Sequence, residues 1–206
     1  MRDQILSEFL ERLAARVPAP GGGATAALHV AQAAALVGMV ARYSDGPKYA
    51  GAREVIDGVV AESDELRQRA LRLAERDASA FTAVTAAYAL PKGTEDEKKA
   101  RSHAIADALL GACRPPAEVI GAAGEVVTLA ERLLPVGNRN VVTDIAAAVE
   151  AARAGATTAR VNIEVNLGGV RDEEARAGLV ATKDGVDGIR ARADKVTAEV
   201  RAGLGA

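Results

Sequence analysis

The chain has 206 residues, enough for one sizeable domain, and carries 26 Lys and Arg against 28 Asp and Glu, a formal net charge of −2. This near balance argues against a protein that binds nucleic acid through a broad basic face. Alanine is abundant and aromatic residues make up only 2%. Because alanine is the best helix former and sheets favour aromatic and β-branched residues, we expect an all-α, single-domain bundle over residues 1–206, with about six to seven helices and long central ones.

The chemistry-bearing residues exclude several kinds of site. Cys113 is the only cysteine, and His29 and His103 are the only histidines. An intrachain disulfide framework and a multi-cysteine zinc site are therefore excluded. The sequence shows no carboxylate cluster that would hold a metal instead, so we expect no metal and no cofactor. The most apolar stretch, residues 24–41, contains polar side chains and is predicted to be a core helix. We expect a cytoplasmic protein with no membrane and no nucleic-acid partner.

The first half of the chain predicts three helical segments. Apolar residues recur at helical spacing from Leu6 to Val17 and indicate an amphipathic first helix. Two prolines and three glycines in residues 18–23 end it. A second helix over residues 24–43 has small side chains on nearly every side, so we expect it to be buried. The third segment, residues 49–89, is predicted to be one long helix or two helices joined by a kink.

Prolines set the predicted boundaries of the next two helices. Thr94 and Glu97 have the spacing of a capping box, in which each side chain satisfies a free N–H at a helix start. The fourth helix is predicted to run from there to about Cys113, because Pro115 and Pro116 follow it. A fifth helix then extends to the next proline.

The last third of the chain is less clear. A sixth helix is predicted from about residue 140 to residue 167, with an alanine-rich first half. Apolar residues near its end alternate as they do in a strand, but the alanine-rich half favours helix: Val161, Ile163, Val165 and Leu167. Residues 172–201 are polar and contain glycines, which predicts a weaker helix on the surface.

One carboxylate lies on an apolar face. With about 100° of rotation per residue, Asp77 lies in the middle of a stripe of apolar residues on the third helix: Val59, Leu66, Ala70, Val84 and Tyr88. A buried carboxylate needs hydrogen-bond donors or a cationic partner, or it shifts its pKa and takes up a proton. Asp77 is therefore either a structural residue bonded to a helix terminus or an arginine, or a general acid/base poised by desolvation.

A second carboxylate shares a face with small and polar residues. Asp144 is predicted near the start of the sixth helix, in line with Gly155, Asn162 and Asn166. Spacing alone favours close helix packing with a carboxylate at a helix start. The alternative is a floor for a flat ligand, with Asp144 and the two asparagines bonding the ligand's edge.

Two turns also allow a structural and a functional interpretation. Gly21, Gly22 and Gly23 either let the chain turn into the second helix or present free N–H groups to an anion. They are not a phosphate loop, because no Gly-Lys-Ser/Thr follows. Asn138 and Asn140 belong to a predicted turn and are candidates for polar contacts.

Several short strings occur together in one order and spacing: Phe9-Leu10, Pro20-Gly21-Gly22-Gly23, Asp77-Ala78-Ser79-Ala80-Phe81, Leu90-Pro91-Lys92 with Glu97-Lys98 and Arg101, Pro116, Gly137-Asn138 with Asp144, and Val161-Asn162 with Asn166-Leu167. Over residues 5–170 the chain thereby resembles the cyclodeaminase/cyclohydrolase family of folate one-carbon enzymes. The resemblance implies an all-helical homodimer that acts on a tetrahydrofolate substrate without a metal or redox cofactor.

The resemblance also implies roles for particular residues. It places a catalytic aspartate at Asp77 and brings Asp144 and its polar neighbours toward the substrate, which gives these candidates for substrate binding: Asn138, Asn140, Asp144, Asn162 and Asn166. The substrate's glutamate tail is anionic, and its candidate partners are the glycine turn and two lysines: Gly21, Gly22, Gly23, Lys48 and Lys92.

The first functional hypothesis is hydrolysis of 5,10-methenyltetrahydrofolate to formyltetrahydrofolate by carboxylate acid/base catalysis. The alternative from the same family is a formiminotetrahydrofolate cyclodeaminase that releases ammonia. A third hypothesis is a non-catalytic, folate-binding helical protein. Asp77 argues against the third, because an idle scaffold would gain stability from an apolar residue in that stripe.

Overall fold

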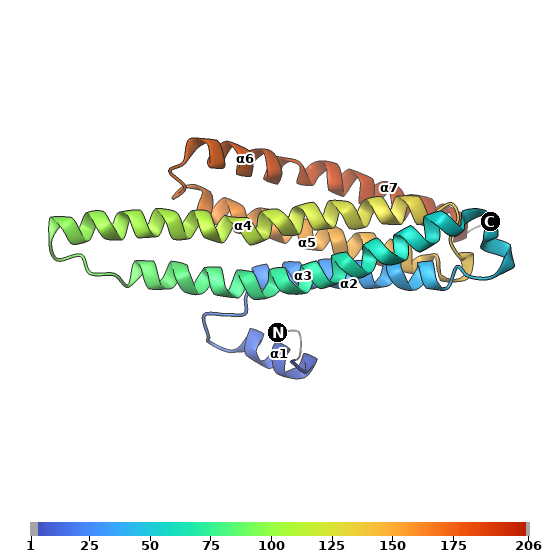
Figure 1. The fold of residues 1–206 in the computed structure, drawn as a ribbon, viewed down its shortest axis with the longest axis horizontal. Helices are drawn as coiled ribbons and strands as arrows, with labels where there is room; N and C mark the ends of the chain where they lie inside the picture. The colour runs from blue at the N-terminus through green and yellow to red at the C-terminus, as the bar shows by residue number, and fades with distance from the viewer. Residues whose placement is uncertain (1–3, 205–206) are drawn as a thin grey trace.

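The computed structural model describes residues 4–204, and these form helices joined by short connections without a β-strand (Figure 1). The elements are α1 (Leu6–Ala14), α2 (Gly22–Arg42), the 3₁₀ helix η1 (Pro47–Ala52), α3 (Arg53–Tyr88), α4 (Glu95–Leu133), the 3₁₀ helix η2 (Arg139–Val141), α5 (Thr143–Leu167), α6 (Glu173–Asp184) and α7 (Val186–Leu204). The prediction of an all-α bundle with long central helices is confirmed.

The helices form one elongated bundle around α2. Helix α2 packs mainly against α3 and α5, and α4 packs against both of these neighbours. Helices α6 and α7 lie along α4 and α5, while α1 stands apart from the bundle (Figure 1). Helix α2 is long and apolar enough to cross a membrane by length and composition, and 61% of its most apolar window is buried inside this bundle. Its place in the core is the one that the sequence predicted.

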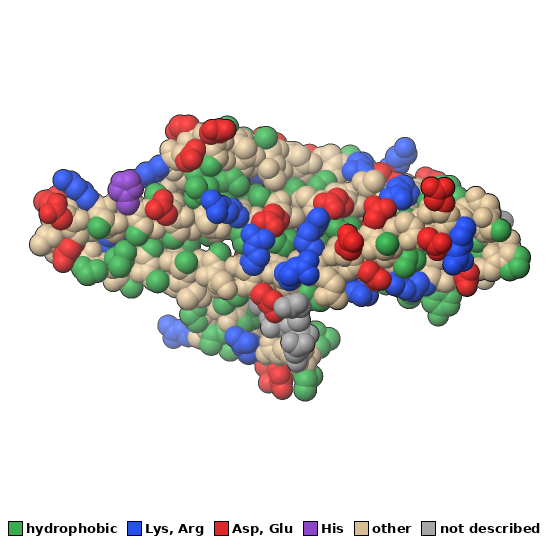
Figure 2. Space-filling view, viewed as in Figure 1, with side chains coloured by type: hydrophobic (Ala, Val, Ile, Leu, Met, Phe, Trp, Pro, Cys, Tyr) green, Lys and Arg blue, Asp and Glu red, His purple; other side chains and the backbone are tan. Residues whose placement is uncertain are grey.

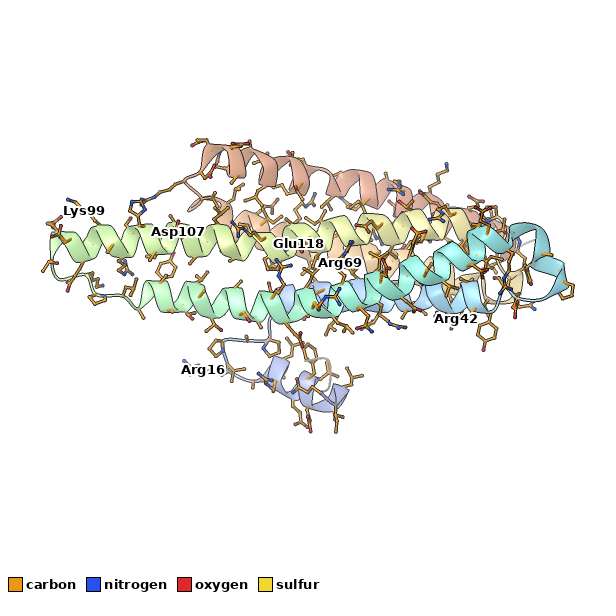
Figure 3. All side chains as sticks on the ribbon, viewed as in Figure 1. Arg16, Arg42, Arg69, Lys99, Asp107 and Glu118 are labelled. Carbon is orange, nitrogen blue, oxygen red and sulfur yellow. The ribbon has the colours of Figure 1, made fainter. Side chains whose placement is uncertain are left out.

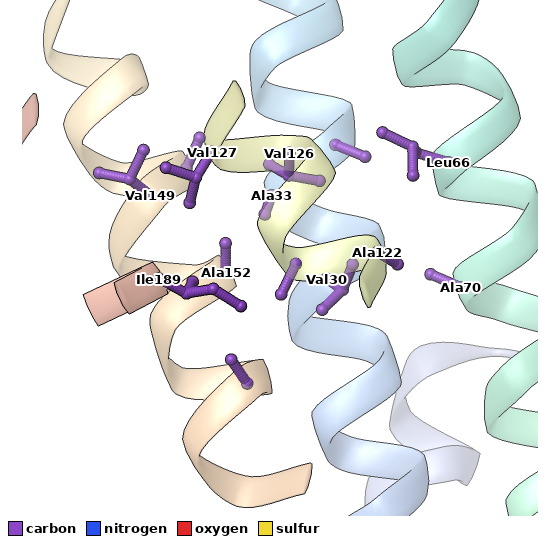
Figure 4. Packing of buried hydrophobic residues seen from close by; sticks show 14 of the residues in the cluster. Val30, Ala33, Leu66, Ala70, Ala122, Val126, Val127, Val149, Ala152 and Ile189 are labelled. Carbon is purple, nitrogen blue, oxygen red and sulfur yellow. The ribbon is translucent and has the colours of Figure 1, made fainter. Parts of the chain in front are cut away.

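Small residues allow the central helices to approach closely. Val30 and Ala33 of α2 lie among apolar side chains of the neighbouring helices, including Leu66 (Figure 4). A Cβ atom at Gly155 of α5 would lie only 2.7 Å from Cγ2 of Val30, so this contact between α2 and α5 requires a glycine. The abundance of alanine thus has a packing role in addition to its helix propensity.

The prediction that Pro115 and Pro116 separate two helices is wrong, because α4 continues through both of them for 39 residues. A proline inside a helix removes one hydrogen bond and costs about 3 kcal/mol. Both prolines are buried, and α4 packs along its length against α3 and α5. Tertiary packing therefore outweighs the local preference, at the cost of two backbone donors in the middle of the helix.

The remaining predictions about elements have simple outcomes. The third segment is one helix, α3, and its successor begins with the predicted capping box: Thr94 Oγ1 accepts from the N–H of Glu97 at 3.2 Å, and Glu97 Oε2 accepts from that of Thr94 at 2.9 Å. The alternating residues 161–167 are helical and complete α5. The polar last segment forms two helices, which are separated at Gly185.

Candidate functional site

The structure contains two hollows of interest. The larger, of about 680 Å³, lies between α3 and α4 and is lined mostly by charged and polar residues. Acidic and basic side chains alternate across this region (Figure 2), and Arg69 on α3 pairs with Glu125 on α4 at 2.5 Å (Figure 3 labels Arg69). Arg132 pairs with Glu62 in the same way at 2.7 Å. These charged side chains form ion pairs with one another across the hollow, and we therefore take the smaller hollow as the candidate site.

The smaller hollow has a volume of about 280 Å³ and lies where α2 begins. Helices α2, α3, α4 and α5 all contribute to it, together with the connection before α2. Its lining residues are Pro18, Ala19, Gly21, Gly22, Gly23, Asp77, Ala80, Phe81, Val84, Ala112, Asn162, Val165 and Asn166. Mostly apolar walls with a few converging polar groups are typical of a small-molecule site.

The carboxyl group of Asp77 lies against the N-terminus of α2. A Cβ atom at Gly23 would overlap this carboxyl group, so glycine there is what allows the carboxyl group to occupy this position. Burial raises the pKa of Asp77, and a hydrogen bond from the backbone N–H of Ala24 partly opposes this rise. The structure is thus compatible with both interpretations of Asp77. The residue is bonded to a helix terminus, as in the structural interpretation, and it also lines a pocket, as a general acid/base would.

The glycine turn and Asp77 are one arrangement. The turn was a predicted anion site, and the group that occupies this helix N-terminus is the protein's own Asp77 carboxyl group. No lysine or arginine is among the residues that line the pocket in the described chain. The negative charge of Asp77 is therefore held by backbone dipoles alone, which leaves the pocket suited to a cationic group or to a proton.

Two asparagines complete the polar part of the pocket. Asn166 donates from Nδ2 to the backbone oxygen of Asn162 at 3.0 Å, which fixes its side chain along α5. The Nδ2 atom of Asn162 is buried and has no hydrogen-bond partner. Because an unpaired buried donor is costly, this group is available to a ligand's acceptor. The structure thus places Asn162 and Asn166 in the same pocket as Asp77 and the glycines, and their contact with a substrate stays a prediction.

The apolar stripe around Asp77 is only partly a core. Val59, Leu66 and Ala70 are buried as expected, but Phe81 is 45% and Tyr88 is 52% exposed. Helix α2 begins beside Asp77, so the part of α3 beyond that residue has no α2 to pack against. Phe81 and Val84 therefore form a wall of the pocket. Helical spacing predicted Val84 on this face of α3 but did not predict that either residue lines a pocket.

The other predicted binding residues lie outside the pocket. Asp144 begins α5 while Asn162 is near its end, about 27 Å away along the axis at 1.5 Å per residue. Within one chain, Asp144 and the two asparagines therefore do not form the single binding surface that was predicted for a flat ligand. Asn138 donates from Nδ2 to the Tyr43 oxygen at 2.8 Å and accepts from the N–H of Asn140 at 3.0 Å, as in a structured turn.

The two candidate lysines lie at opposite ends of the bundle (Figure 1). Lys48 belongs to η1, with Nζ 5.4 Å from the ring centre of Tyr49. Lys92 lies on the exposed connection between α3 and α4. Neither lines the pocket. Contacts of these lysines, and of Asp144, Asn138 and Asn140, with a substrate remain predictions.

The raised pKa of Asp77 predicts how the Asp77→Asn variant depends on pH. A carboxyl whose pKa is raised by folding contributes stability below its unfolded pKa, about 3.9, and this contribution is lost as pH rises through the folded pKa. The amide does not titrate and still accepts from Ala24. Relative to the wild type, the variant should therefore gain free energy of unfolding as the pH rises above about 4, which urea melts at a series of pH values would measure. A difference independent of pH would contradict the assignment.

The chain is similar in sequence to known proteins over most of its length. A sequence profile described as formiminotransferase-cyclodeaminase matches residues 5–184. A methenyltetrahydrofolate cyclohydrolase of Methylorubrum extorquens is 39% identical over 171 residues, which are 82% of each chain. The formimidoyltransferase-cyclodeaminase of Rattus norvegicus is 30% identical over 176 residues, and these cover 83% of this chain but only 32% of the rat protein.

A solved structure shows the same architecture. The formiminotetrahydrofolate cyclodeaminase of Thermotoga maritima superposes with a TM-score of 0.84 at 28% identity, over 97% of this chain and 98% of that one. The relatives are named as enzymes of folate one-carbon chemistry, and this agrees with the resemblance read from the residues. The chain belongs to the formiminotransferase-cyclodeaminase family and is a folate one-carbon enzyme.

Proposed function

We propose that this protein hydrolyses 5,10-methenyltetrahydrofolate to 10-formyltetrahydrofolate. The observation that carries the proposal is the carboxylate of Asp77, partly buried in a pocket whose described lining has no cationic side chain. In the methenyl substrate the one-carbon unit bridges N5 and N10 as an amidinium-like cation. An uncompensated carboxylate in a poorly solvated site is the complement of such a cation.

The same carboxyl group is suited to move the protons of the reaction. Water attacks the bridging carbon and loses a proton to Asp77, which gives a neutral tetrahedral carbon between two nitrogens. Asp77 returns this proton to N5 as the bond between N5 and that carbon breaks. The hydroxyl proton leaves to solvent, and the formyl group remains on N10. Only protons and C–O and C–N bonds are involved, so the proposal calls for no metal or redox cofactor.

The raised pKa of Asp77 fits both halves of this cycle. The bound cation favours the ionised carboxylate, which then accepts a proton from water. Once the cation is consumed, the buried carboxyl favours its protonated form and is ready to act as an acid. The dipole of α2 and the N–H of Ala24 keep the group in place in both forms.

The alternative is ring closure of formiminotetrahydrofolate with release of ammonia. The Thermotoga and rat relatives are named for that activity, and the reaction also passes through a tetrahedral carbon and needs one proton shuttle. Hydrolysis is favoured because the Methylorubrum protein is the more similar in sequence and because the match covers most of both chains.

We also propose that the active form is a homodimer in the cytoplasm. Apolar side chains are exposed on α1 and near the pocket: Leu6 is 67%, Leu10 51% and Val161 58% accessible. Helix α1 stands apart from the bundle (Figure 1), which leaves these side chains of α1 for a second copy to cover. The family resemblance supports the dimer, and the sequence supports the location.

The homodimer is tested by sedimentation equilibrium of the wild type and of a Leu6→Glu/Leu10→Glu double variant. The wild type should sediment as a dimer, and the variant should dissociate because charges replace exposed apolar side chains. The Glu substitutions leave the buried Phe9 in place, so circular dichroism should show unchanged helix content. A monomeric wild type would contradict the proposal.

The reaction is tested by giving the protein methenyltetrahydrofolate and formiminotetrahydrofolate separately. We expect loss of the methenyl absorbance in the first assay and much slower ammonia release in the second. Asp77→Asn should fold and lose on the order of 10²- to 10⁴-fold in kcat for the first reaction, as expected for removal of a general acid/base. Fast ammonia release would favour the alternative, and full activity of the variant would remove Asp77 from the mechanism.

A pair of glycine substitutions tests the placement of the Asp77 carboxyl group. Alanine at Gly23 would overlap it and displace it from the N-terminus of α2, whereas alanine at Gly22 meets Asn162 Oδ1 only at 3.9 Å. Gly23→Ala should lower kcat by about 10²-fold or more, and Gly22→Ala should change it by less than about threefold. Equal losses in the two variants would mean that the position of Asp77 does not limit the rate.

A further inference from the structure

The side-chain acceptors in the pocket's lining are the Asp77 carboxyl group and the amide oxygens of Asn162 and Asn166. A folate pteridine presents N–H donors and an exocyclic carbonyl oxygen along one edge. Asp144 was a predicted partner for the edge of a flat ligand, but it lies at the other end of α5 from the pocket. Asp77 accepts from the N–H of Ala24 and, in the proposed reaction, would face the reacting carbon. Because Asn166 is fixed by its bond to Asn162 and Asn162 offers a donor, we ask whether the backbone supplies a further acceptor for the ring edge.

We propose that the backbone carbonyl of Ala112 is this acceptor and that Pro116 makes it available, an inference that rests on the proposed function. In an α-helix the carbonyl of residue 112 accepts from the N–H of residue 116. Residue 116 is proline and has no N–H, so this carbonyl has no donor at its usual position in α4. Ala112 is the residue that α4 contributes to the lining of the pocket.

The pocket then presents a donor and an acceptor on facing elements. Asn162 Nδ2, on α5, is buried without a partner and needs an acceptor. The Ala112 carbonyl, on α4, needs a donor. The amide-like edge of a pteridine supplies both: its exocyclic carbonyl oxygen accepts from Asn162 and its adjacent N–H groups donate to Ala112. Phe81 and Val165 provide apolar walls for the ring faces.

The position of the two prolines argues for a role in binding beyond bending the helix. Pro116 frees the carbonyl of Ala112, which lines the pocket, whereas Pro115 frees that of Gly111, which does not. The chain thus offers a matched pair of substitutions one residue apart. Pro116→Ala returns the missing N–H to the Ala112 carbonyl, and Pro115→Ala returns one to a carbonyl outside the site.

The test compares the wild type, Pro116→Ala and Pro115→Ala in steady-state turnover of methenyltetrahydrofolate and in calorimetric binding of tetrahydrofolate. Pro116→Ala should raise KM and the Kd for tetrahydrofolate by about three- to tenfold, the worth of one hydrogen bond, with kcat within about twofold. Pro115→Ala should leave all three constants unchanged. Both variants should keep or raise the melting temperature, because alanine is the better helix former.

A change in the ligand tests the same hydrogen bond to the Ala112 carbonyl without depending on the stability of a variant. An analogue in which the 2-amino group of the pteridine is replaced by methyl should bind the wild type about three- to tenfold more weakly than tetrahydrofolate, and Pro116→Ala should no longer distinguish the two. Equal affinity of the wild type for both ligands, or unchanged binding by Pro116→Ala, would overturn this inference alone. A wild type that neither binds tetrahydrofolate nor turns over the methenyl compound would overturn the proposed function with it.

Discussion

The contact between the Asp77 carboxyl group and the first turn of α2 organises the functional end of this molecule. Helix starts carry unsatisfied N–H groups and a partial positive charge, and here a carboxylate from another helix meets them. Gly23 must lack a side chain for this to happen. At this contact α2 begins beside α3, the Asp77 carboxyl group is held in place, and the pocket lies beyond it.

The balance between burial and hydrogen bonding decides the chemistry of that carboxyl group. A cationic side chain beside it would have lowered its pKa and neutralised its field. Backbone donors hold it with less compensation, so desolvation dominates and its pKa rises. A substrate that carries a positive charge would then provide the cationic partner that the protein does not place beside Asp77. In the proposed reaction, cation binding and proton transfer would therefore both depend on this one carboxyl group.

The sequence predicted the helical elements better than it predicted the site. Periodicity and composition were enough for α2, α3 and α5, and the helical wheel located Asp77, because these depend on local spacing. The place where α2 begins along α3 depends on tertiary packing, so the exposure of Phe81 could not be predicted. Asp144 shares a helix face with Asn162, but a face says nothing about distance along the axis. Pro115 and Pro116 lie inside α4 because tertiary packing outweighs the local preference of proline for a helix end.

The departures from local preference converge on the pocket, and this convergence is itself informative. An aspartate within an apolar stripe, a glycine inside the first turn of a helix, and a proline within a long helix each cost stability where they stand. Scattered through the fold, they would be unrelated defects. They come from α3, α2 and α4: Asp77 and Gly23 line the cavity, and Pro116 lies one turn along α4 from its lining residue Ala112. Local conflicts are expected at functional sites, and three that share one location identify it more firmly than any one of them.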